Sequence, residues 1–462
     1  MAKIDLAQTP QYLDKEIELF GWIDVRRDHG KLIFFDLRDR SGKVQLVVTP
    51  APNELHALAE KLRPEWVVKV KGKVAPRPEA MKNSKEATGE IEVKVSDIQV
   101  LAEAKAPPFD ISGDGYDIGE ETRLKYRYLD LRRPRLQKNL KLRHQILQFM
   151  RNYLAEKDFI EIETPILTKA TPEGARDFIV PSRLQPGKFY ALPQSPQQYK
   201  QLLMLAGFEK YFQIARCFRD EDPRADRAYG EFTQLDLEMS FATQDEILSI
   251  TEELFIKIAE DVLGKKILEN PFPRFSHAEA MERFGADKFD LRKDKNSDVA
   301  AFAWVLDFPL FEKTETRELR PSHHPFTSPK EEDAPLLDKD PAKVRSWQHD
   351  LVLNGYEIGG GSIRISDPKL QRKIFEILGH GEKEIQEKFG HLLEAFEYGL
   401  PPHGGIALGI ERLLAAFLGE ENVREVAAFP MTAGGRTAVM DAPSEVFEKE
   451  LRELGIEIKK KK

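Results

Sequence analysis

The sequence contains a single cysteine, Cys217, among 462 residues. One cysteine excludes an internal disulfide framework and a zinc site built from cysteines. No uninterrupted apolar run approaches the roughly 18 residues that a membrane-spanning helix needs. The first residues also lack the apolar core of a secretory signal. These absences predict a cytoplasmic protein that has no membrane segment.

A basic excess is missing as well. The chain has 70 Lys and Arg against 78 Asp and Glu, a net charge of −8, whereas nucleic-acid-binding proteins usually carry a basic footprint. There is no P-loop and no dinucleotide fingerprint, so nucleotide binding by those two routes is not indicated. What is present is 41% hydrophobic and 32% charged residues, which is typical of a globular protein with a sizeable core.

The first hundred residues alternate between apolar and polar side chains, as strands do. A helical spacing at residues 52–62 falls between the third and fourth of five such runs. The runs are 16–23, 31–37, 44–48, 66–74 and 91–95. This order predicts an OB-fold barrel over residues 1–105, with another small β-barrel as the alternative.

The remainder of the chain changes character. Residues 106–135 are rich in turns and then in arginine, and we expect a hinge or linker there. Apolar residues recur at three- and four-residue steps over 136–158, which predicts a long helix. Short apolar runs mixed with helices follow at irregular distances. Residues 136–462 are therefore predicted to form an α+β domain, built on an antiparallel sheet flanked by helices.

Four segments of this second part combine charged residues with glycines or turns. Arg219, Arg364 and Arg412 lie in or beside them, and each arginine is either a structural ion pair or a clamp for phosphate or carboxylate. Glycine-rich stretches permit a ligand to approach the backbone closely. The segments are 161–167, 216–222 with 231–236, 354–364 and 404–412.

Together these segments resemble the signature motifs of class II aminoacyl-tRNA synthetases. Motif one corresponds to residues 136–167, motif two to 211–241 and motif three to 404–418. Further stretches are similar to aspartyl-tRNA synthetases in particular, including the loop that closes over the substrate. These stretches are 170–178, 194–201, 323–327 and 355–362. The resemblance implies that aspartate reacts with ATP to give aspartyl-adenylate and is then transferred to the 3′ end of the aspartate tRNA.

The resemblance also assigns residues to ATP and Mg²⁺. Arg219 would hold the α-phosphate, Arg412 the γ-phosphate, and Phe232 would stack on the adenine ring. Asp350 and Glu357 would hold Mg²⁺, a hard cation that prefers oxygen ligands. The remaining residues implied for ATP are Asp220, Glu221, Glu357, Gly409, Ile410 and Glu411. In-line attack on a phosphate depends mainly on positioning and on neutralising charge, which suits these residue types.

Two cations match the positions that face the aspartate side chain, Lys200 and Arg364. They would reject asparagine, because its neutral amide leaves charge unpaired. Other residues implied around the amino acid are Glu173, Gln197, Arg219, Asp236 and His323. An asparagine–tRNA ligase stays open as an alternative, and so does a non-catalytic nucleic-acid-binding protein built on the same fold.

On the barrel, the resemblance implies that the anticodon contacts Arg26, His29, Phe34 and Gln45. OB folds read single strands by stacking bases on aromatic rings and bonding to base edges, although Phe34 could instead be ordinary barrel core. A histidine at position 29 tends to accompany enzymes that also charge the asparagine tRNA. Ala80, where glycine is common, leaves the second part of that pattern open.

Two more expectations follow from the resemblance. Motif one forms a homodimer interface in class II enzymes, with its proline, here Pro165, near the two-fold axis. Bacterial members carry a large domain inserted between motifs two and three, whereas residues 272–300 here look like a remnant of that site. The motif-two loop at residues 227–231 also departs from the common bacterial form.

Overall fold

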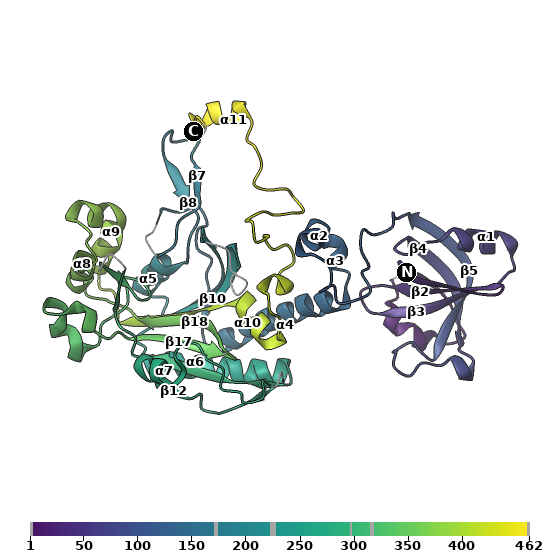
Figure 1. The fold of residues 1–462 in the computed structure, drawn as a ribbon, viewed down its shortest axis with the longest axis horizontal. Helices are drawn as coiled ribbons and strands as arrows, with labels where there is room; N and C mark the ends of the chain where they lie inside the picture. Colours follow the sequence, from purple (N-terminus) through teal and green to yellow (C-terminus); the bar gives the residue numbers. More distant parts are fainter. Residues whose placement is uncertain (1–2, 171–173, 222–227, 296–297, 315–317, 460–462) are drawn as a thin grey trace. The chain divides into compact units, whose positions relative to one another are not determined.

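A computed structural model describes residues 3–170, 174–221, 228–295, 298–314 and 318–459. The chain divides into two compact units, Met1–Asp110 and Ile111–Lys462. Their elements are drawn in Figure 1. None of the helices in the described ranges is long and apolar enough to cross a membrane.

The first unit is a closed five-stranded barrel in the order β1-β2-β3-β5-β4. Helix α1 (Asn53–Lys61) lies between β3 and β4, which confirms the predicted OB order. Alternate residues of each strand point inward, so Leu19, Phe35 and Val70 fill the barrel core. The strands are β1 (Glu16–His29), β2 (Leu32–Arg38), β3 (Lys43–Val48), β4 (Val67–Pro76) and β5 (Ile91–Ala102).

The second unit is built on an eight-stranded sheet in the order β12-β14-β17-β18-β19-β10-β9-β6. All pairings are antiparallel except those of the two edge strands β12 and β6, so the predicted α+β class is confirmed. The strands are β6 (Ile160–Glu161), β9 (Lys210–Arg219), β10 (Gly230–Ser240), β12 (Arg274–Ser276), β14 (Phe302–Leu306), β17 (Gln348–Leu353), β18 (Tyr356–Ile363) and β19 (His403–Gly409).

Helices cover one face of this sheet (Figure 1). The helices are α4 (Pro134–Glu156), α6 (Gln244–Lys257) and α10 (Ile410–Leu418). Their apolar residues, such as Ile146, Phe255 and Leu413, pack against Leu235 and Ile406 of the sheet in one core. Because side chains alternate along a strand, the intervening residues of β10, β17 and β19 face the opposite side, where the functional site lies.

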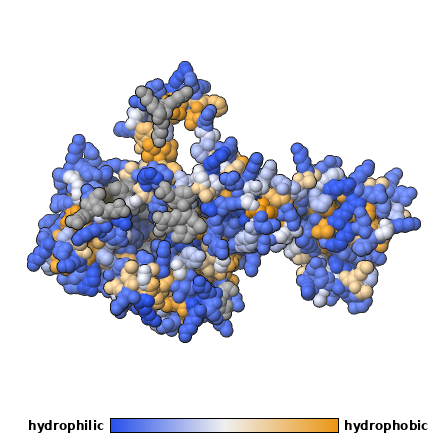
Figure 2. Space-filling model, in the orientation of Figure 1, coloured by the Kyte–Doolittle hydropathy of each residue, from blue (hydrophilic) through white to orange (hydrophobic). Residues whose placement is uncertain are grey.

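Smaller elements lie around that opposite side. They are α5 (Gln197–Leu205), α7 (His277–Phe284), α8 (Pro368–Ile377), α9 (Glu382–Phe396), the hairpin β7 (Ile179–Pro181) with β8 (Phe189–Ala191), the hairpin β15 (Phe311–Lys313) with β16 (Leu319–Pro321), and α11 (Glu448–Leu454). Figure 2 shows a mostly hydrophilic surface, on which apolar side chains gather over the β7–β8 hairpin. Ile179, Leu184, Phe189 and Tyr190 are its large exposed apolar or aromatic residues.

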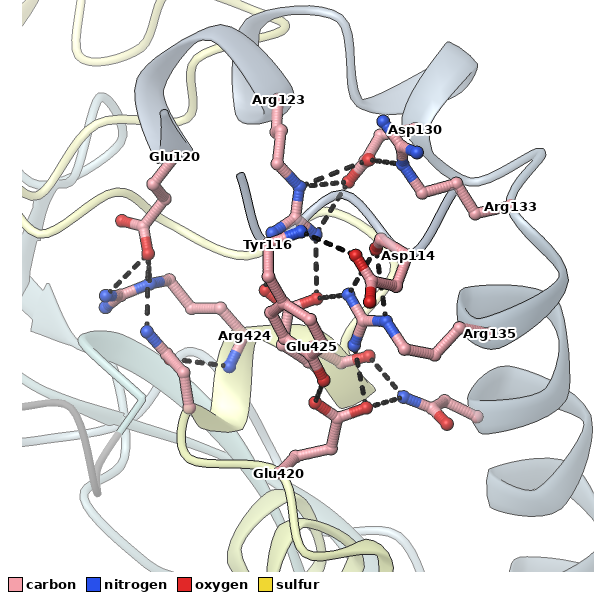
Figure 3. A network of polar contacts seen from close by, with 12 residues as sticks. Asp114, Tyr116, Glu120, Arg123, Asp130, Arg133, Arg135, Glu420, Arg424 and Glu425 are labelled. Carbon is pink, nitrogen blue, oxygen red and sulfur yellow. Dashed lines mark hydrogen bonds and ion pairs between the residues drawn. The ribbon is translucent and has the colours of Figure 1, made fainter. Parts of the chain in front are cut away.

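Residues 111–135, part of the stretch that we expected to be a hinge, belong to the second unit. They include α2 (Glu120–Lys125) and α3 (Arg127–Asp130). The carboxylate of Asp130 accepts hydrogen bonds from Arg123 and Arg133 (Figure 3). It also accepts one from Arg127, and all four side chains are buried. These buried ion pairs join α2 to α3 within the segment.

Candidate active site

The register of the sheet places Asp350 and Asp236 on one face, with only Gly360 and Ala407 in the row between them. This part of the face, which has almost no side chains, is the floor of the site. Asp350 on β17 lies opposite Gly360 on β18, Gly360 opposite Ala407 on β19, and Ala407 opposite Asp236 on β10. A Cβ atom on Gly360 would come within 2.6 Å of the Asp350 Oδ1 atom. The glycine therefore keeps the floor open, and a cavity of about 670 Å³ lies above it.

Four buried charges lie together at one end of this cavity, and three of them, Lys200, Asp236 and Arg364, line it. The Lys200 Nζ atom lies 2.8 Å from Asp236 Oδ2 and 3.0 Å from Glu238 Oε2. Arg364 donates from Nε to Glu238 Oε1 over 2.9 Å, and all four side chains are at most 1% exposed. Burial alone would raise the pKa of Glu238, but Arg364 and Lys200 lower it to about 2. Burial raises the pKa of Asp236 against the opposing pull of Lys200.

Glu238 was not among the predicted site residues. It lies two residues after Asp236 on the same strand, so the period-two pattern of β10 puts both carboxylates on one face. That spacing was the signal that could have found it. The structure shows Glu238 to be the shared counter-ion of the two predicted cations, Lys200 and Arg364.

Several buried polar atoms that line this end have no hydrogen-bond partner within the described residues. They are Gln197 Nε2, Asp236 Oδ1, Ser322 Oγ, His323 Nδ1 and Gln348 Oε1. An unsatisfied buried donor or acceptor costs roughly 1–3 kcal/mol, so these atoms mark places where a ligand would bond. Three of the five were predicted for the amino acid. Ser322 and Gln348 were not, although Gln348 shares a strand face with Asp350.

His323 is a neutral member of this set. Burial lowers its pKa to about 3, and the nearby Arg364 guanidinium acts in the same direction. The ring therefore stays uncharged at neutral pH and can donate or accept a hydrogen bond.

The other end of the cavity is more exposed. The Arg219 guanidinium lies 5.0 Å from the centre of the Phe232 ring, and both side chains are half-buried. Arg412 lies against Glu357, with Nη1 3.6 Å from Glu357 Oε2. Glu221 and Gly409 also line this end. An aromatic face, two guanidinium groups and an open floor can receive a planar base and phosphates.

Three residues predicted for ATP lie elsewhere or are otherwise engaged. Ile410 is fully buried in the core beneath the sheet. Glu411 borders the cavity but accepts hydrogen bonds from the Thr233 backbone N–H at 2.9 Å and from Arg143 at 2.8 Å. Asp220 is not part of the described lining. Its carboxylate lies 3.8 Å from Arg176 and accepts a hydrogen bond from the Tyr229 hydroxyl at 3.4 Å.

The two predicted metal ligands share the cavity. Burial, followed by repulsion from Glu357, raises the pKa of Asp350 well above its usual value, and the Gln348 amide donates to the Asp350 carboxylate at 3.2 Å. No group of three or more His, Cys, Asp or Glu residues that could hold a metal occurs in the described part of the chain. Mg²⁺ is usually held by one or two carboxylates together with substrate phosphates, so this pair fits it. Glu173 lies outside the described residues.

In the first unit, Phe35 belongs to the barrel core, whereas Phe34 points to the opposite face of β2. The His29 ring meets Phe34 edge-on with centroids 5.8 Å apart. Gln45 donates to Glu92 at 3.2 Å, while Arg26 is paired with Asp28. Ala80 is exposed in a short helical turn at Glu79–Met81.

Two protein-family models match the chain. The model described as tRNA synthetases class II (D, K and N) covers residues 119–433, and the OB-fold nucleic acid binding domain covers residues 17–101. The "Aspartate--tRNA(Asp/Asn) ligase" of Rubrobacter xylanophilus is 44% identical over 96% of this chain and 94% of its own length. The "Aspartate--tRNA ligase" of Macrococcus caseolyticus is 41% identical over 97% of each chain.

These two alignments span 569 and 577 residues, more than this chain has, so both relatives carry segments that it lacks. Among solved structures, asparaginyl-tRNA synthetase from Pyrococcus horikoshii, complexed with asparaginyl-adenylate, matches with a TM-score of 0.75 and 26% identity. That match covers 94% of this chain and 98% of the other. A putative aspartyl-tRNA synthetase from Leishmania major matches in fold, with a TM-score of 0.75 at 23% identity over 93% and 94% of the two chains.

Proposed function

Because the chain belongs to the class II tRNA synthetases (D, K and N), we propose that it is an aspartate–tRNA ligase that acts in the cytoplasm. It joins L-aspartate to ATP with release of pyrophosphate, then transfers the aspartyl group to the 3′ end of the aspartate tRNA. The observation that carries this choice is the buried pair of cations, Lys200 and Arg364, at one end of the cavity.

Lys200 is the member of this pair that favours a carboxylate over an amide, because the Arg364 guanidinium already bonds to Glu238, His324, Ser362 and the Gly405 carbonyl. Lys200 has three N–H donors, and within the described residues its ammonium meets two carboxylates, so one donor remains for a ligand oxygen. An asparagine amide has one oxygen that can accept a hydrogen bond and one NH₂ group that cannot. In one of its two orientations the NH₂ group would face the Lys200 ammonium, which is also a donor, and in either orientation the amide brings no charge. Asp236 Oδ1 and Gln197, whose partners are missing, suit the ammonium and carboxylate of the amino acid.

In the first step, an oxygen of the aspartate α-carboxylate attacks the α-phosphorus and pyrophosphate leaves. Arg219 reaches into the cavity beside Phe232, so it can neutralise charge on the α-phosphate while the ring holds adenine. Arg412 would hold the far phosphates. A bound Mg²⁺ would neutralise further phosphate charge, and Asp350 and Glu357 are the residues that would hold it.

Amino-acid-dependent exchange of pyrophosphate into ATP tests this function. The purified protein should catalyse exchange with L-aspartate and show a kcat/KM at least about a hundredfold lower with L-asparagine. Exchange that depends on asparagine, or no exchange with either amino acid, would contradict the proposal.

A homodimer is supported by the surface of motif one. Pro165, Ile166 and Leu167 are exposed beside the edge strand β6, whose Ile160 is 51% exposed. A second copy related by a two-fold axis would cover this apolar strip. Sedimentation at micromolar concentration should give a dimer, and Ile160→Asp should shift it toward the monomer. A fully active monomer in the wild type would contradict this assembly.

We also propose that the enzyme charges the asparagine tRNA. The support is His29, which lies exposed against Phe34 on the barrel and can both donate and accept hydrogen bonds, so it can tolerate two different bases. Aspartylation of the two purified transcripts should differ by less than about tenfold in the wild type. His29→Leu should lower charging of the asparagine tRNA more than that of the aspartate tRNA. Wild-type discrimination of a hundredfold or more would show that the histidine interpretation is wrong.

A further inference from the structure

The chain that leaves motif three is held by buried polar contacts. Glu425 accepts hydrogen bonds from Arg123 at 3.1 and 2.8 Å and from Arg135 at 2.8 Å (Figure 3). Glu420 accepts from Arg135, Asn139 and Tyr116, each at 2.7 Å. The direction of residues 420–425 is therefore set by segments that lie about 300 positions earlier in the sequence.

Arg127 extends this hold farther along the chain. Its guanidinium donates to the backbone carbonyls of Arg424, Ala427 and Ala428 over 2.8 to 3.0 Å, and its own side chain is 2% exposed. The backbone is thus fixed up to two residues before Pro430.

A closed turn follows at residues 432–436. The Thr432 N–H donates to the Arg436 carbonyl at 2.8 Å, the Gly435 N–H donates to the Thr432 carbonyl at 3.0 Å, and the Arg436 N–H donates to Thr432 Oγ1 at 3.2 Å. Gly435 has a φ of +71°, which favours glycine. A Cβ atom there would lie 2.6 Å from the ring of Tyr229. The turn therefore presents a bare backbone against this ring.

A second contact lies beside the first. Gly230, with a φ of +73°, is covered by Met431, whose sulfur would be 2.8 Å from a Cβ atom on that glycine. Tyr229 and Gly230 both line the cavity, and Gly230 begins β10, the strand that carries Phe232. The Tyr229 hydroxyl also donates to Asp220 at 3.4 Å. These two residues therefore form a wall of the cavity at the end that contains Phe232 and Arg219, which we call the nucleotide end.

We propose that residues 430–436 act as a latch that positions Tyr229 and Gly230, at the start of β10, for ATP, with Gly435 and Met431 as positioning residues that act through these two contacts. The latch joins the chain that follows motif three to Tyr229 and Gly230, in the middle of motif two, beside Phe232 and Arg219 of the cavity. The opposite end of the cavity, which contains Lys200 and Arg364 and which we call the amino-acid end, is lined by other residues. We therefore expect the latch to affect ATP and not the amino acid. This inference rests on the proposed function, because the readout is ATP use.

Three glycine substitutions separate the latch from ordinary backbone strain. Gly435→Ala introduces both a strained φ and a clash with Tyr229. Gly455→Ala introduces only the strain, since its φ is +66° and nothing lies within 4 Å. Gly434→Ala introduces neither. We expect Gly435→Ala to raise the KM for ATP about fivefold or more, with the KM for aspartate within about twofold and both controls near wild type in each parameter.

A double-mutant cycle then shows whether the effect passes through the ring. In a Tyr229→Ala background, Gly435→Ala should change the KM for ATP by less than about twofold, because the clash is gone. Melting temperatures of all variants monitor folding. The latch is overturned if Gly435→Ala leaves the KM for ATP unchanged, matches Gly455→Ala, or has the same effect in both backgrounds. Absence of exchange in the wild type would instead overturn the proposed function.

Discussion

The two ends of the cavity differ in how far the protein completes them before any ligand arrives. At the amino-acid end, Lys200, Arg364, Asp236 and Glu238 form a charge-balanced set that is almost fully buried. At the nucleotide end, Arg219 and Phe232 are half-buried, and the Arg219 guanidinium lies over the Phe232 ring. One end has its geometry set by buried ion pairs, and the other retains side chains that a ligand can still arrange.

This difference implies that the amino-acid end determines which amino acid binds, whereas the nucleotide end mainly binds and orients the other substrate. The buried charges there are already paired with one another, so the amino-acid end can admit only a ligand whose polar groups match the unsatisfied donors and acceptors that remain. The nucleotide end offers an aromatic face and guanidinium groups, which suit any ligand with a planar base and phosphates. We therefore expect substitutions at the first end to affect stability and amino-acid choice, and substitutions at the second to affect catalysis.

The largest effect should come from Glu238→Gln. It removes the carboxylate that Lys200 and Arg364 share, and leaving a buried cation uncompensated costs about 3–5 kcal/mol of unfolding free energy. Glu231→Gln on the same strand is the matched control. Its ion pair with Arg216 is exposed, so the loss should stay below about 1 kcal/mol. Urea denaturation measures both, and equal losses would contradict the contrast between buried and exposed charge.

Arg219→Ala should lower the exchange rate by about 10²–10³-fold, because a donor that meets charge developing on the phosphate is lost. Its side chain is half-buried and takes part in no buried ion pair in the described structure, so the melting temperature should stay close to that of the wild type. Exchange kinetics and thermal denaturation test this together. Near-normal exchange, or a large loss of stability, would remove the distinction between the two ends.

Lys200→Met should raise the KM for aspartate by about a hundredfold and the KM for ATP by less than about threefold, because aspartate is the one of the two substrates that loses a charge partner. Lys210→Met, on β9 away from the cavity lining, serves as the control for loss of a lysine. An equal rise for both substrates would mean that Lys200 does not face the amino acid.

The smallest effect should be a pH dependence of stability at the amino-acid end. Burial lowers the pKa of His403, which bonds to Gln201 and to the Pro401 carbonyl. Below the pKa of about 6.5 that histidine has in the unfolded chain, the unfolded chain binds a proton that the folded chain does not bind. The free energy of unfolding therefore decreases as the pH decreases, by up to about 1.4 kcal/mol per pH unit. Unfolding free energies at pH 7.5, 6.5 and 5.5 should fall less steeply in His403→Gln. The exposed His144→Gln should keep the wild-type slope.

Local patterns predicted the local structure. The five alternating runs of the first hundred residues correspond to the five barrel strands, because alternation of apolar and polar residues indicates which face of a strand is buried. The order of the eight-stranded sheet could not be predicted from such patterns, because neighbours such as β10 and β19, or β6 and β9, lie far apart in the sequence. β17 and β10, which carry Asp350 and Asp236 to one floor, are separated by two other strands in the sheet and by more than a hundred residues in the chain.

The site shows the same limit. Resemblance to a family predicted Lys200 and Arg364 as site residues, but not their shared partner Glu238 or the unsatisfied amide of Gln348, because partners are set by register across strands. It also treated residues 409–412 as one stretch that binds ATP. The change from strand to helix at Gly409 sends Ile410 into the core, while Arg412 reaches the cavity.

The most direct test of a pre-built amino-acid end is calorimetric titration of the protein with L-aspartate and with L-asparagine, in the absence of ATP and tRNA. We predict that aspartate binds and that asparagine binds at least about a hundredfold more weakly, a difference of roughly 2.7 kcal/mol. Equal binding of the two amino acids, or tighter binding of asparagine, would contradict the account.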